Sequence, residues 1–372
     1  MEDETEDLDL PEDLEDVEVI YSDGEYDEND EMDEINNTED VVVNDMSKYT
    51  FTKHNKSVFT VDISPNQQCV VTGSEDDSAY VWNLNTREVL FECTGHKDSI
   101  TEACFNHDGQ YVATGDMSGM VQVWHVDDNK LVWCNEGDDL EWMCWHPLTN
   151  VLIIGCRSGD IYIWQVPQSN CKVLPSHGCA TSCGKVLPDG KKLVSGYEDG
   201  QIKLWDIKAA TTIWQLSEPC SAGIISLDMN SDGTLLAVAP TSQLILLNDG
   251  RVIGNLHSNT NKDVEAILMS SEIGVLVTGA LSGELCVWDL GKHMLRHQAR
   301  IESSVTVIKW GRDGKVFVGA TDGAIYLCDV RSGTLLNTFT GHKKDILDIA
   351  IPKSGQYILS SSDDCTVKIF DV

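Results

Sequence analysis

The sequence predicts an all-β protein, an eight-bladed β-propeller with a disordered acidic N-terminal tail. Three observations predict this fold. A repeat of about 41 residues recurs along the chain, strand-like runs alternate with turn residues inside each repeat, and no window shows sustained helical periodicity. The repeats occupy residues 48–372, and residues 1–47 form the tail.

Each repeat ends in a β-branched run that closes on a large apolar anchor residue. The intervals between successive anchors are 42, 40, 41, 42, 41, 40 and 42 residues. The anchors are Trp82, Trp124, Trp164, Trp205, Leu247, Trp288, Cys328 and Phe370. A unit of this length buries its apolar face only by stacking on its neighbours, so the repeats should form one closed array.

Turns divide each repeat into short strands. Asp108-Gly109, Asp189-Gly190 and Asp313-Gly314 are turn dipeptides in the middle of their repeats, and strand-like runs such as YVATG follow them. A repeat of 40–45 residues with Gly-His and Trp-Asp signatures is typical of the WD40 β-propeller.

Polar residues recur at fixed offsets from the anchors. A His lies 28 residues before the anchor, a Ser or Thr 10 before it and an Asp six before it. The pattern resembles the WD40 network in which His bridges the hydroxyl and the Asp, and the hydroxyl reaches the Trp indole. We therefore assign a structural role to His54, Thr72, Asp76 and Trp82, to His177, Ser195, Asp199 and Trp205, and to His342, Ser360, Asp364 and Phe370. Asp322 occupies the Asp offset in the seventh repeat and is assigned to the same role.

The two ends of the repeat array predict how the ring closes. The last repeat stops at Val372, after its third strand, and residues 49–52 can supply the missing outer strand. This pairing would remove an exposed sheet edge. A chain that starts at Lys56 should therefore be destabilised, whereas one that starts at Met46 should melt like the full chain.

Charge is distributed unevenly. The chain has 61 Asp and Glu against 26 Lys and Arg, and residues 1–45 hold 22 of the carboxylates without any Lys or Arg. Such a tail cannot bury enough apolar area to fold. The excess of carboxylates disfavours nucleic acid and anionic membranes and favours a basic protein or peptide. Ser22 lies in an acidic context that suits phosphorylation, although an unmodified serine fits equally well.

Catalytic and metal-binding motifs are missing. We find no phosphate-binding glycine loop, no HExxH and no GxSxG, so no enzyme activity and no cofactor are expected. His177, Cys179 and Cys183 lack the spacing of a structural zinc site, which predicts core cysteines and no metal. Thirteen Cys without a CxxC pair, no secretory signal and no membrane-spanning run predict a soluble, cytoplasmic monomer.

Acidic loop residues are the candidates for partner binding. In a propeller the loops that enter the innermost strands share one face with the loops between the second and third strands. Carboxylates are frequent in turns, and a Trp often packs between blades, so part of this set has only a structural role. Trp142 could instead stack on an Arg or Lys of the partner. The candidates are Glu75, Asp77, Asp98, Asp116, Glu136, Asp138, Asp139, Glu141, Trp142, Glu198, Asp263 and Glu265.

The stretch from Asp138 to Lys208 is more distinctive than the repeat itself. Its segments DDLEWMCWHP, CRSGDIYIWQVP and VLPDGKKLVSGYEDGQIKLWDIK, with LRHQ and GHKKDILD further on, resemble the angio-associated migratory cell protein family. The resemblance implies two functions. A fungal relative shields the basic N-terminus of a large-subunit ribosomal protein, and animal members are associated with cell migration and angiogenesis, with a membrane-peripheral pool.

We expect the first of these functions, the binding of a basic segment of a new ribosomal protein for large-subunit assembly. A signalling scaffold is the alternative. A cullin–RING ubiquitin ligase adaptor is a third possibility, because Cys328-Asp329-Val330-Arg331 keeps the Asp and Arg of an adaptor motif but lacks its Trp.

Overall fold

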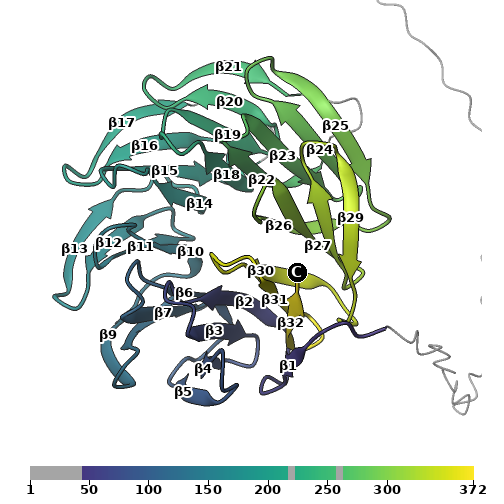
Figure 1. Ribbon diagram of the computed structural model, residues 1–372. Coiled ribbons are helices and arrows are strands. Elements are labelled where there is room, and N and C mark those ends of the chain that lie inside the picture. The colour runs from purple at the N-terminus through teal and green to yellow at the C-terminus, as the bar shows by residue number, and fades with distance from the viewer. Residues whose placement is uncertain (1–43, 217–222, 257–262) are drawn as a thin grey trace, which may run out of the picture. The chain divides into compact units, whose positions relative to one another are not determined.

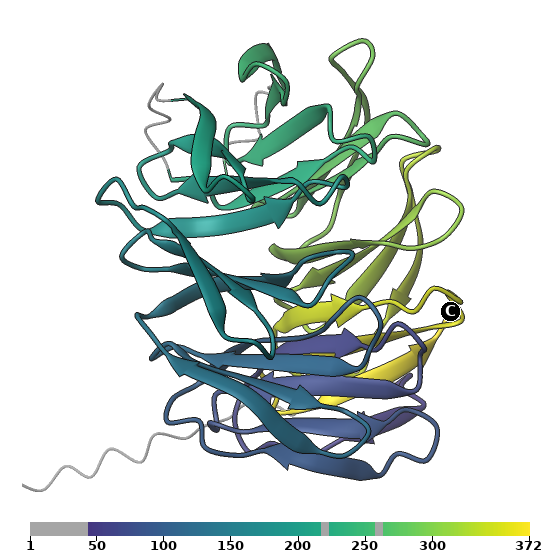
Figure 2. The same ribbon diagram turned by 90° about the vertical axis from the view of Figure 1, so that its left-hand side faces the viewer.

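The computed structural model describes residues 44–216, 223–256 and 263–372. These residues form eight four-stranded antiparallel sheets arranged around a common centre, which confirms the eight-bladed β-propeller (Figure 1). Figure 2 shows the same ring from the side. We number the blades 1 to 8 in chain order, beginning with the sheet β2-β3-β4-β5.

The two inner rings of strands form most of the core. The innermost strands contact one another around the centre: β2 Val58–Ile63, β6 Ile100–Phe105, β10 Leu140–Trp145, β14 Thr181–Val186, β18 Ser226–Met229, β22 Val264–Ser270, β26 Val305–Trp310 and β30 Ile346–Ala350. The second strands are almost wholly buried: β3 Cys69–Ser74, β7 Tyr111–Asp116, β11 Val151–Cys156, β15 Lys192–Tyr197, β19 Leu235–Ala239, β23 Val275–Ala280, β27 Lys315–Ala320 and β31 Tyr357–Ser362. Their β-branched, Ala and Gly residues suit a strand that is covered on both faces.

The two outer rings complete the blades. The third strands carry the anchor residues or end next to them: β4 Ala79–Asn83, β8 Met120–His125, β12 Ile161–Gln165, β16 Ile202–Asp206, β20 Gln243–Leu246, β24 Glu284–Asp289, β28 Ile325–Asp329 and β32 Val367–Asp371. The outermost strands are more exposed: β5 Val89–Cys93, β9 Lys130–Glu136, β13 Asn170–Leu174, β17 Thr211–Leu216, β21 Arg251–Asn255, β25 Met294–Arg300, β29 Thr334–Phe339 and, in blade 8, β1 Tyr49–Phe51.

Blades pack closely because a small residue recurs in the second strands. A Cβ atom added to Gly73 would lie 2.6 Å from Cγ2 of Ile100 in the next blade, so only glycine allows this approach. Ile100 is fully buried in an apolar cluster that also holds Val71 and Val81 of blade 1. The repeat therefore folds by burying each apolar face against the next blade.

Blade 8 is completed by the N-terminal strand. Tyr49 lies opposite Ile369, and Phe51 lies opposite Val367, in the pairing of β1 with β32. Phe51 is 2% exposed and its ring stacks on Trp82 of blade 1, with centroids 5.0 Å apart. The two ends of the propeller thus share one sheet, and β32 presents no open edge.

Residues ahead of Lys48 also contact blade 8. The Asn44 carbonyl accepts a hydrogen bond from Thr340, the Met46 amide donates to the Thr340 carbonyl, and Asp45 pairs with the nearly buried ammonium of Lys368 at 2.6 Å. A chain that starts at Met46 loses the carboxylate of this pair, so it should not melt like the full chain. The disordered tail was predicted over residues 1–47, and residues 44–46 make these contacts instead. The predicted disorder of residues 1–43 lies outside the described residues and stays a prediction.

Candidate functional site

The two faces of the propeller are set by its antiparallel strands. Loops that lead into the innermost strands end on the same face as the turns between second and third strands, and backbone hydrogen bonds join them. The amide of Glu75 donates to the Ser57 carbonyl, and that of Asp363 donates to the Asp345 carbonyl. We call this the acidic face, defined by loop residues 52–57, 75–78, 94–99, 117–119, 137–139, 157–160, 175–180, 198–201, 263, 281–283, 302–304, 321–324, 340–345 and 363–366.

The recurring polar residues form hydrogen-bond networks in blades 1 and 8. Nδ1 of His54 lies 3.2 Å from Asp76, and its Nε2 lies 2.9 Å from the Thr72 hydroxyl. In blade 8, His342 makes the same contacts with Asp364 and Ser360, both at 2.9 Å. These histidines are buried, so neither is available to a partner.

The network carboxylates are held ionised. Burial alone would raise the pKa of Asp364, but hydrogen bonds from His342 and Thr366 and the Lys343 amide lower it to about 2. The pKa of Asp76 is likewise lowered well below its usual value by His54 and Ser78, in spite of burial. The negative charges of Asp76 and Asp364 therefore serve the hydrogen-bond networks inside the blades.

Three members of the predicted networks differ from the expected pattern. Among the described residues the buried indole N–H of Trp82 has no acceptor, while Phe51 stacks on the face of its ring. His177 contacts Asp199 but not Ser195, whose hydroxyl accepts the Trp205 indole N–H at 2.9 Å. In blade 7, Asp322 accepts a hydrogen bond from the Tyr326 hydroxyl and not from a His.

Asp116 was expected on the partner-binding surface, and this is wrong. It is fully buried, 2.9 Å from Nδ1 of His96, whose Nε2 lies 2.8 Å from Thr114. Blade 2 therefore has the same network with the Asp two residues earlier. Asp116 follows His96 by 20 residues, whereas Asp76 follows His54 by 22. The rule that the Asp lies six residues before the anchor therefore did not identify Asp116 as a network residue.

Trp142 also does not reach the surface. It is 6% exposed, and its indole N–H donates to the Thr181 hydroxyl at 3.1 Å. A Cβ atom at Gly155 or Gly184 would lie 2.2 Å or less from this ring, so two glycines from neighbouring strands make room for it. Trp142 packs blade 3 against blade 4 and cannot stack on a partner cation.

A group of exposed and partly exposed carboxylates lies where blades 3 and 4 meet. We call it the carboxylate cluster. It surrounds the buried thiol of Cys156, whose pKa is raised to about 12 by burial and then by the carboxylates around it. Burial and the adjacent Glu198 and Asp139 also raise the pKa of Glu141, which Arg157 lowers. Glu141 is thus beside Glu198 although they belong to different blades. The cluster consists of Asp138, Asp139, Glu141, Asp160 and Glu198.

Backbone hydrogen bonds fix the loops that carry the cluster. The Arg157 amide donates to the Asp139 carbonyl, and the Ser158 amide donates to the Asp138 carboxylate at 2.9 Å. Asp160 accepts the Ser176 amide at 2.6 Å. Asp160 and Arg157 were missed in the sequence because they sit in an ordinary turn. The pairing of β10 with β11 inside blade 3, which places Leu140 opposite Cys156, brings that turn to the cluster.

The other predicted carboxylates are spread around the ring. Glu75 lies 3.7 Å from Lys56, and Glu136 lies 3.0 Å from Lys97, so each already has a basic neighbour. Three others lie at intervals in loops of the acidic face: Asp77, Asp98 and Asp263. Glu265 is part-buried in the innermost strand β22 and not in a loop.

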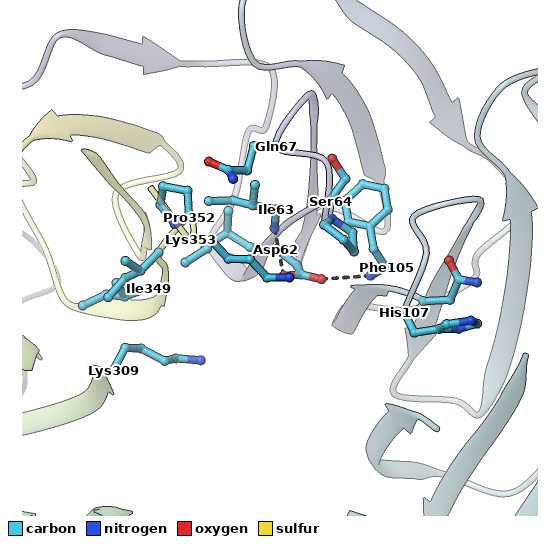
Figure 3. Close-up of a pocket in the computed structure, with 15 residues that line it drawn as sticks. Asp62, Ile63, Ser64, Gln67, Phe105, His107, Lys309, Ile349, Pro352 and Lys353 are labelled. Atoms are coloured by element: carbon cyan, nitrogen blue, oxygen red, sulfur yellow. Dashed lines mark hydrogen bonds between the residues drawn. The ribbon is translucent and has the colours of Figure 1, made fainter. Parts of the chain in front are cut away.

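A pocket of about 450 Å³ at the centre of the opposite face has different chemistry (Figure 3). Asp62 and Lys309 line it, and Lys309 lies 3.0 Å from Asp348. Burial raises the pKa of Asp62 to about 6 and that of the neighbouring Glu102 to about 8. Near neutral pH this pocket therefore carries less negative charge than its residue types suggest.

Two further features concern the chain as a whole. The predicted phosphorylation site Ser22 lies outside the described residues. Within residues 44–216, 223–256 and 263–372, no helix has the length and apolar character needed to cross a membrane.

The repeated blades and their His–Asp networks define a WD40 repeat protein. The WD domain, G-beta repeat family matches residues 46–83, 87–125, 168–206 and 333–371, and these are the four repeats that contain His54, His96, His177 and His342. The chain belongs to the angio-associated migratory cell protein family. It is 39% identical to the human protein of that name over 349 residues, which are 88% of this chain and 80% of the human one.

Fungal proteins are more distant relatives. The ribosome assembly protein SQT1 of Saccharomyces cerevisiae is 24% identical over 400 residues, covering 94% of this chain and 92% of SQT1. The crystal structure of Chaetomium thermophilum Sqt1 bound to the N-terminus of the ribosomal protein L10 superposes with a TM-score of 0.81 at 20% identity. That alignment covers 88% of this chain and 100% of the fungal one. At this identity the superposition shows the shared fold.

Proposed function

We propose that this chain is a non-enzymatic binding platform that holds a basic segment of a newly made large-subunit ribosomal protein on its acidic face. The carboxylate cluster is the observation that carries this proposal. It presents four carboxylates on hydrogen-bonded loops of two blades and a fifth, the part-buried Glu141, at the start of strand β10, with Arg157 as the adjacent cation. The fungal relative solved with a ribosomal protein N-terminus supports the choice of client.

The arrangement explains how such a platform would bind. An exposed ion pair contributes only about 0.2–1 kcal/mol, so useful affinity needs several carboxylates that engage the basic segment together. Loops that are already fixed pay little conformational entropy when they bind. A client shielded in this way would meet the chain in the cytoplasm, where ribosomal proteins are made, and its affinity would fall as salt rises.

The test is the binding of a labelled peptide with the sequence of the L10 N-terminus, followed by fluorescence anisotropy. The variant Asp139→Lys/Glu141→Lys/Glu198→Lys should bind it about 100-fold more weakly, because three contacts of about 1 kcal/mol each are lost. Asp138 is kept, since its carboxylate holds the Ser158 amide. The affinity of the unaltered chain should also fall steeply with added salt.

A matched control reverses three exposed carboxylates on loops of the opposite face, in Asp127→Lys/Asp232→Lys/Asp249→Lys. Both variants change the net charge equally. An equal loss of peptide affinity in the two variants would show only general electrostatic attraction. Unchanged affinity in the cluster variant would show that the peptide binds at another place. Either result rejects the carboxylate cluster as the binding site.

The higher identity to relatives named for cell migration favours one alternative, a signalling scaffold. A scaffold would bind neutral or acidic partners as readily as basic ones. It would therefore show little dependence on salt or on the charge of the cluster.

A further inference from the structure

Blade 4 departs from the other blades at its histidine. In blades 1, 2 and 8 the His Nδ1 faces the Asp, and Nε2 faces a hydroxyl. In blade 4 the ring is turned, so that Nε2 of His177 lies 2.8 Å from Asp199, and Nδ1 lies 2.9 Å from Nζ of Lys203. His177 makes no contact with Ser195, because both ring nitrogens face other groups; the Ser195 hydroxyl accepts from the Trp205 indole as the network predicts.

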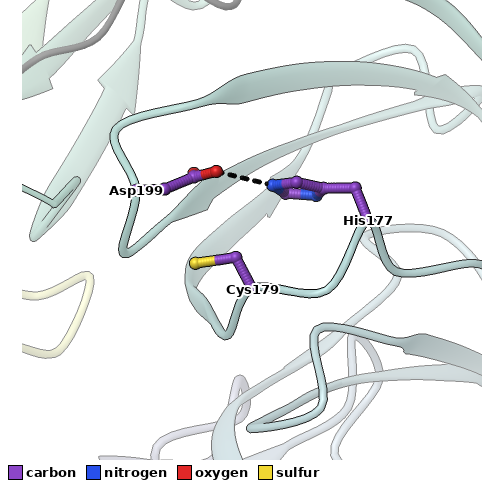
Figure 4. A group of neighbouring side chains, drawn as sticks. All are labelled: His177, Cys179 and Asp199. Carbon is purple, nitrogen blue, oxygen red and sulfur yellow. Dashed lines mark hydrogen bonds and ion pairs between the residues drawn. The ribbon is translucent and has the colours of Figure 1, made fainter.

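The turned ring brings a cysteine into the same group. The residue two positions after the network His is Lys56, Asp98 or Lys344 in the other blades, and in blade 4 it is Cys179. Nε2 of His177, a carboxylate oxygen of Asp199 and Sγ of Cys179 all lie within 4.8 Å of one another (Figure 4).

The three side chains can be reached from solvent. His177 and Asp199 are exposed, and Cys179 is half-buried with a free thiol. Cys183, which the sequence grouped with them, is not part of the site. A Cβ atom added to Gly196 would lie 2.8 Å from its Sγ, which places Cys183 against the second strand of the blade.

We propose that His177, Cys179 and Asp199 bind a Zn²⁺ ion, with water as the fourth ligand. Imidazole nitrogen, thiolate and carboxylate are the three zinc ligands that proteins use, and three of them with one open position form a common tetrahedral site. Tetrahedral ligand atoms lie about 3.3–3.7 Å apart at normal zinc distances. Coordination would bring the three atoms, now within 4.8 Å of one another, to this spacing.

Zinc binding would release two protons to solvent. The thiol proton of Cys179 and the proton that His177 donates to Asp199 leave to solvent, and Nε2, Sγ and the carboxylate bind the metal. The Lys203 ammonium, which now donates to Nδ1, passes one proton to that nitrogen. Bound zinc would link the loop that enters blade 4 to the turn at Asp199, next to Glu198 of the carboxylate cluster.

Cobalt is the appropriate probe, because a Co²⁺–thiolate bond has its own charge-transfer absorption whereas loosely held cations do not. The full chain would be titrated with Co²⁺ in excess Mg²⁺, which occupies weak carboxylate sites. One Co²⁺ per chain should produce the thiolate band and tetrahedral visible absorption, and added Zn²⁺ should remove both. Zn²⁺ should also raise the melting temperature.

The variants identify the ligands. Cys179→Ser should abolish the thiolate band, weaken Co²⁺ binding at least 10-fold and remove the zinc-dependent shift in melting temperature. Cys134→Ser and Cys171→Ser change exposed cysteines elsewhere and should leave the band intact. Circular dichroism without metal checks that each variant is folded. No band at one equivalent of Co²⁺, or an equal band in Cys179→Ser, would overturn the proposal.

Discussion

A chain that begins at Lys53 should lose most of its stability, whereas one that begins at Asn44 should unfold at the same urea concentration as the full chain. The Lys53 start removes β1 but keeps His54 and its network. It leaves β32 as an open edge and removes Phe51, the side chain that stacks on Trp82. Loss of a buried Phe side chain alone costs about 3–5 kcal/mol. That is a large part of the 5–15 kcal/mol that typically stabilises a folded domain.

Urea titration followed by circular dichroism would measure this effect. An intermediate chain that begins at Lys48 separates the contributions of the segment. It keeps β1 but lacks Asp45, so the nearly buried Lys368 loses its carboxylate, and a cost of about 1–3 kcal/mol is expected. A Lys53 chain as stable as the full chain would mean that β1 does not close the ring.

His342→Ala should destabilise the propeller by about 3 kcal/mol, because it strips two buried partners at once. His342 is 1% exposed and contacts both Ser360 and Asp364. His177→Ala is the matched change in a solvent-accessible site. It should cost less than about 1 kcal/mol in the absence of metal, since water can replace an exposed partner. An equal loss of stability in His342→Ala and His177→Ala would contradict the difference in burial between the networks of blades 8 and 4.

The pH dependence gives a second readout of the same network. The pKa of Asp364 is about 2 in the folded chain, below the usual value of about 3.9 for an unfolded one. A lowered carboxyl pKa stabilises the fold above pH 4, and this contribution is lost as the pH falls from about 4 to about 2. His342→Ala removes the main hydrogen-bond donor to Asp364. The difference in stability between variant and unaltered chain should therefore narrow in this window.

The fold could be predicted because the repeat is regular. Eight anchors at intervals of 40 to 42 residues leave no insertion that could hide a blade. The order of strands then determines which loops share a face, so the acidic face follows from topology alone. The blade networks follow from offsets only where the Asp keeps its position in the turn. In blade 2 the strands pair at the same spacing as in blade 1, but the Asp lies two positions earlier, and there the offset rule was wrong.

Side-chain environments that depend on two blades could not be predicted. Trp142 stands beside four acidic residues in the sequence, yet it lies under Gly155 and Gly184 of two other strands. Asp160 is an ordinary turn residue in the sequence. It joins the carboxylate cluster because β10 pairs with β11, and the Ser176 amide of the loop into blade 4 donates to it. The turned ring of His177 likewise depends on Lys203 from another strand. Each case needs contacts between residues far apart in the chain.

The most direct test of the central claim is the identity of the bound partner. The full chain and its Asp139→Lys/Glu141→Lys/Glu198→Lys variant would each be used to capture proteins from nuclease-treated extract, with quantification by mass spectrometry. We predict that one basic ribosomal protein of the large subunit is enriched on the unaltered chain and lost from the variant. Signalling or ubiquitin ligase components that bind both chains equally, without a ribosomal protein, would contradict the proposed function.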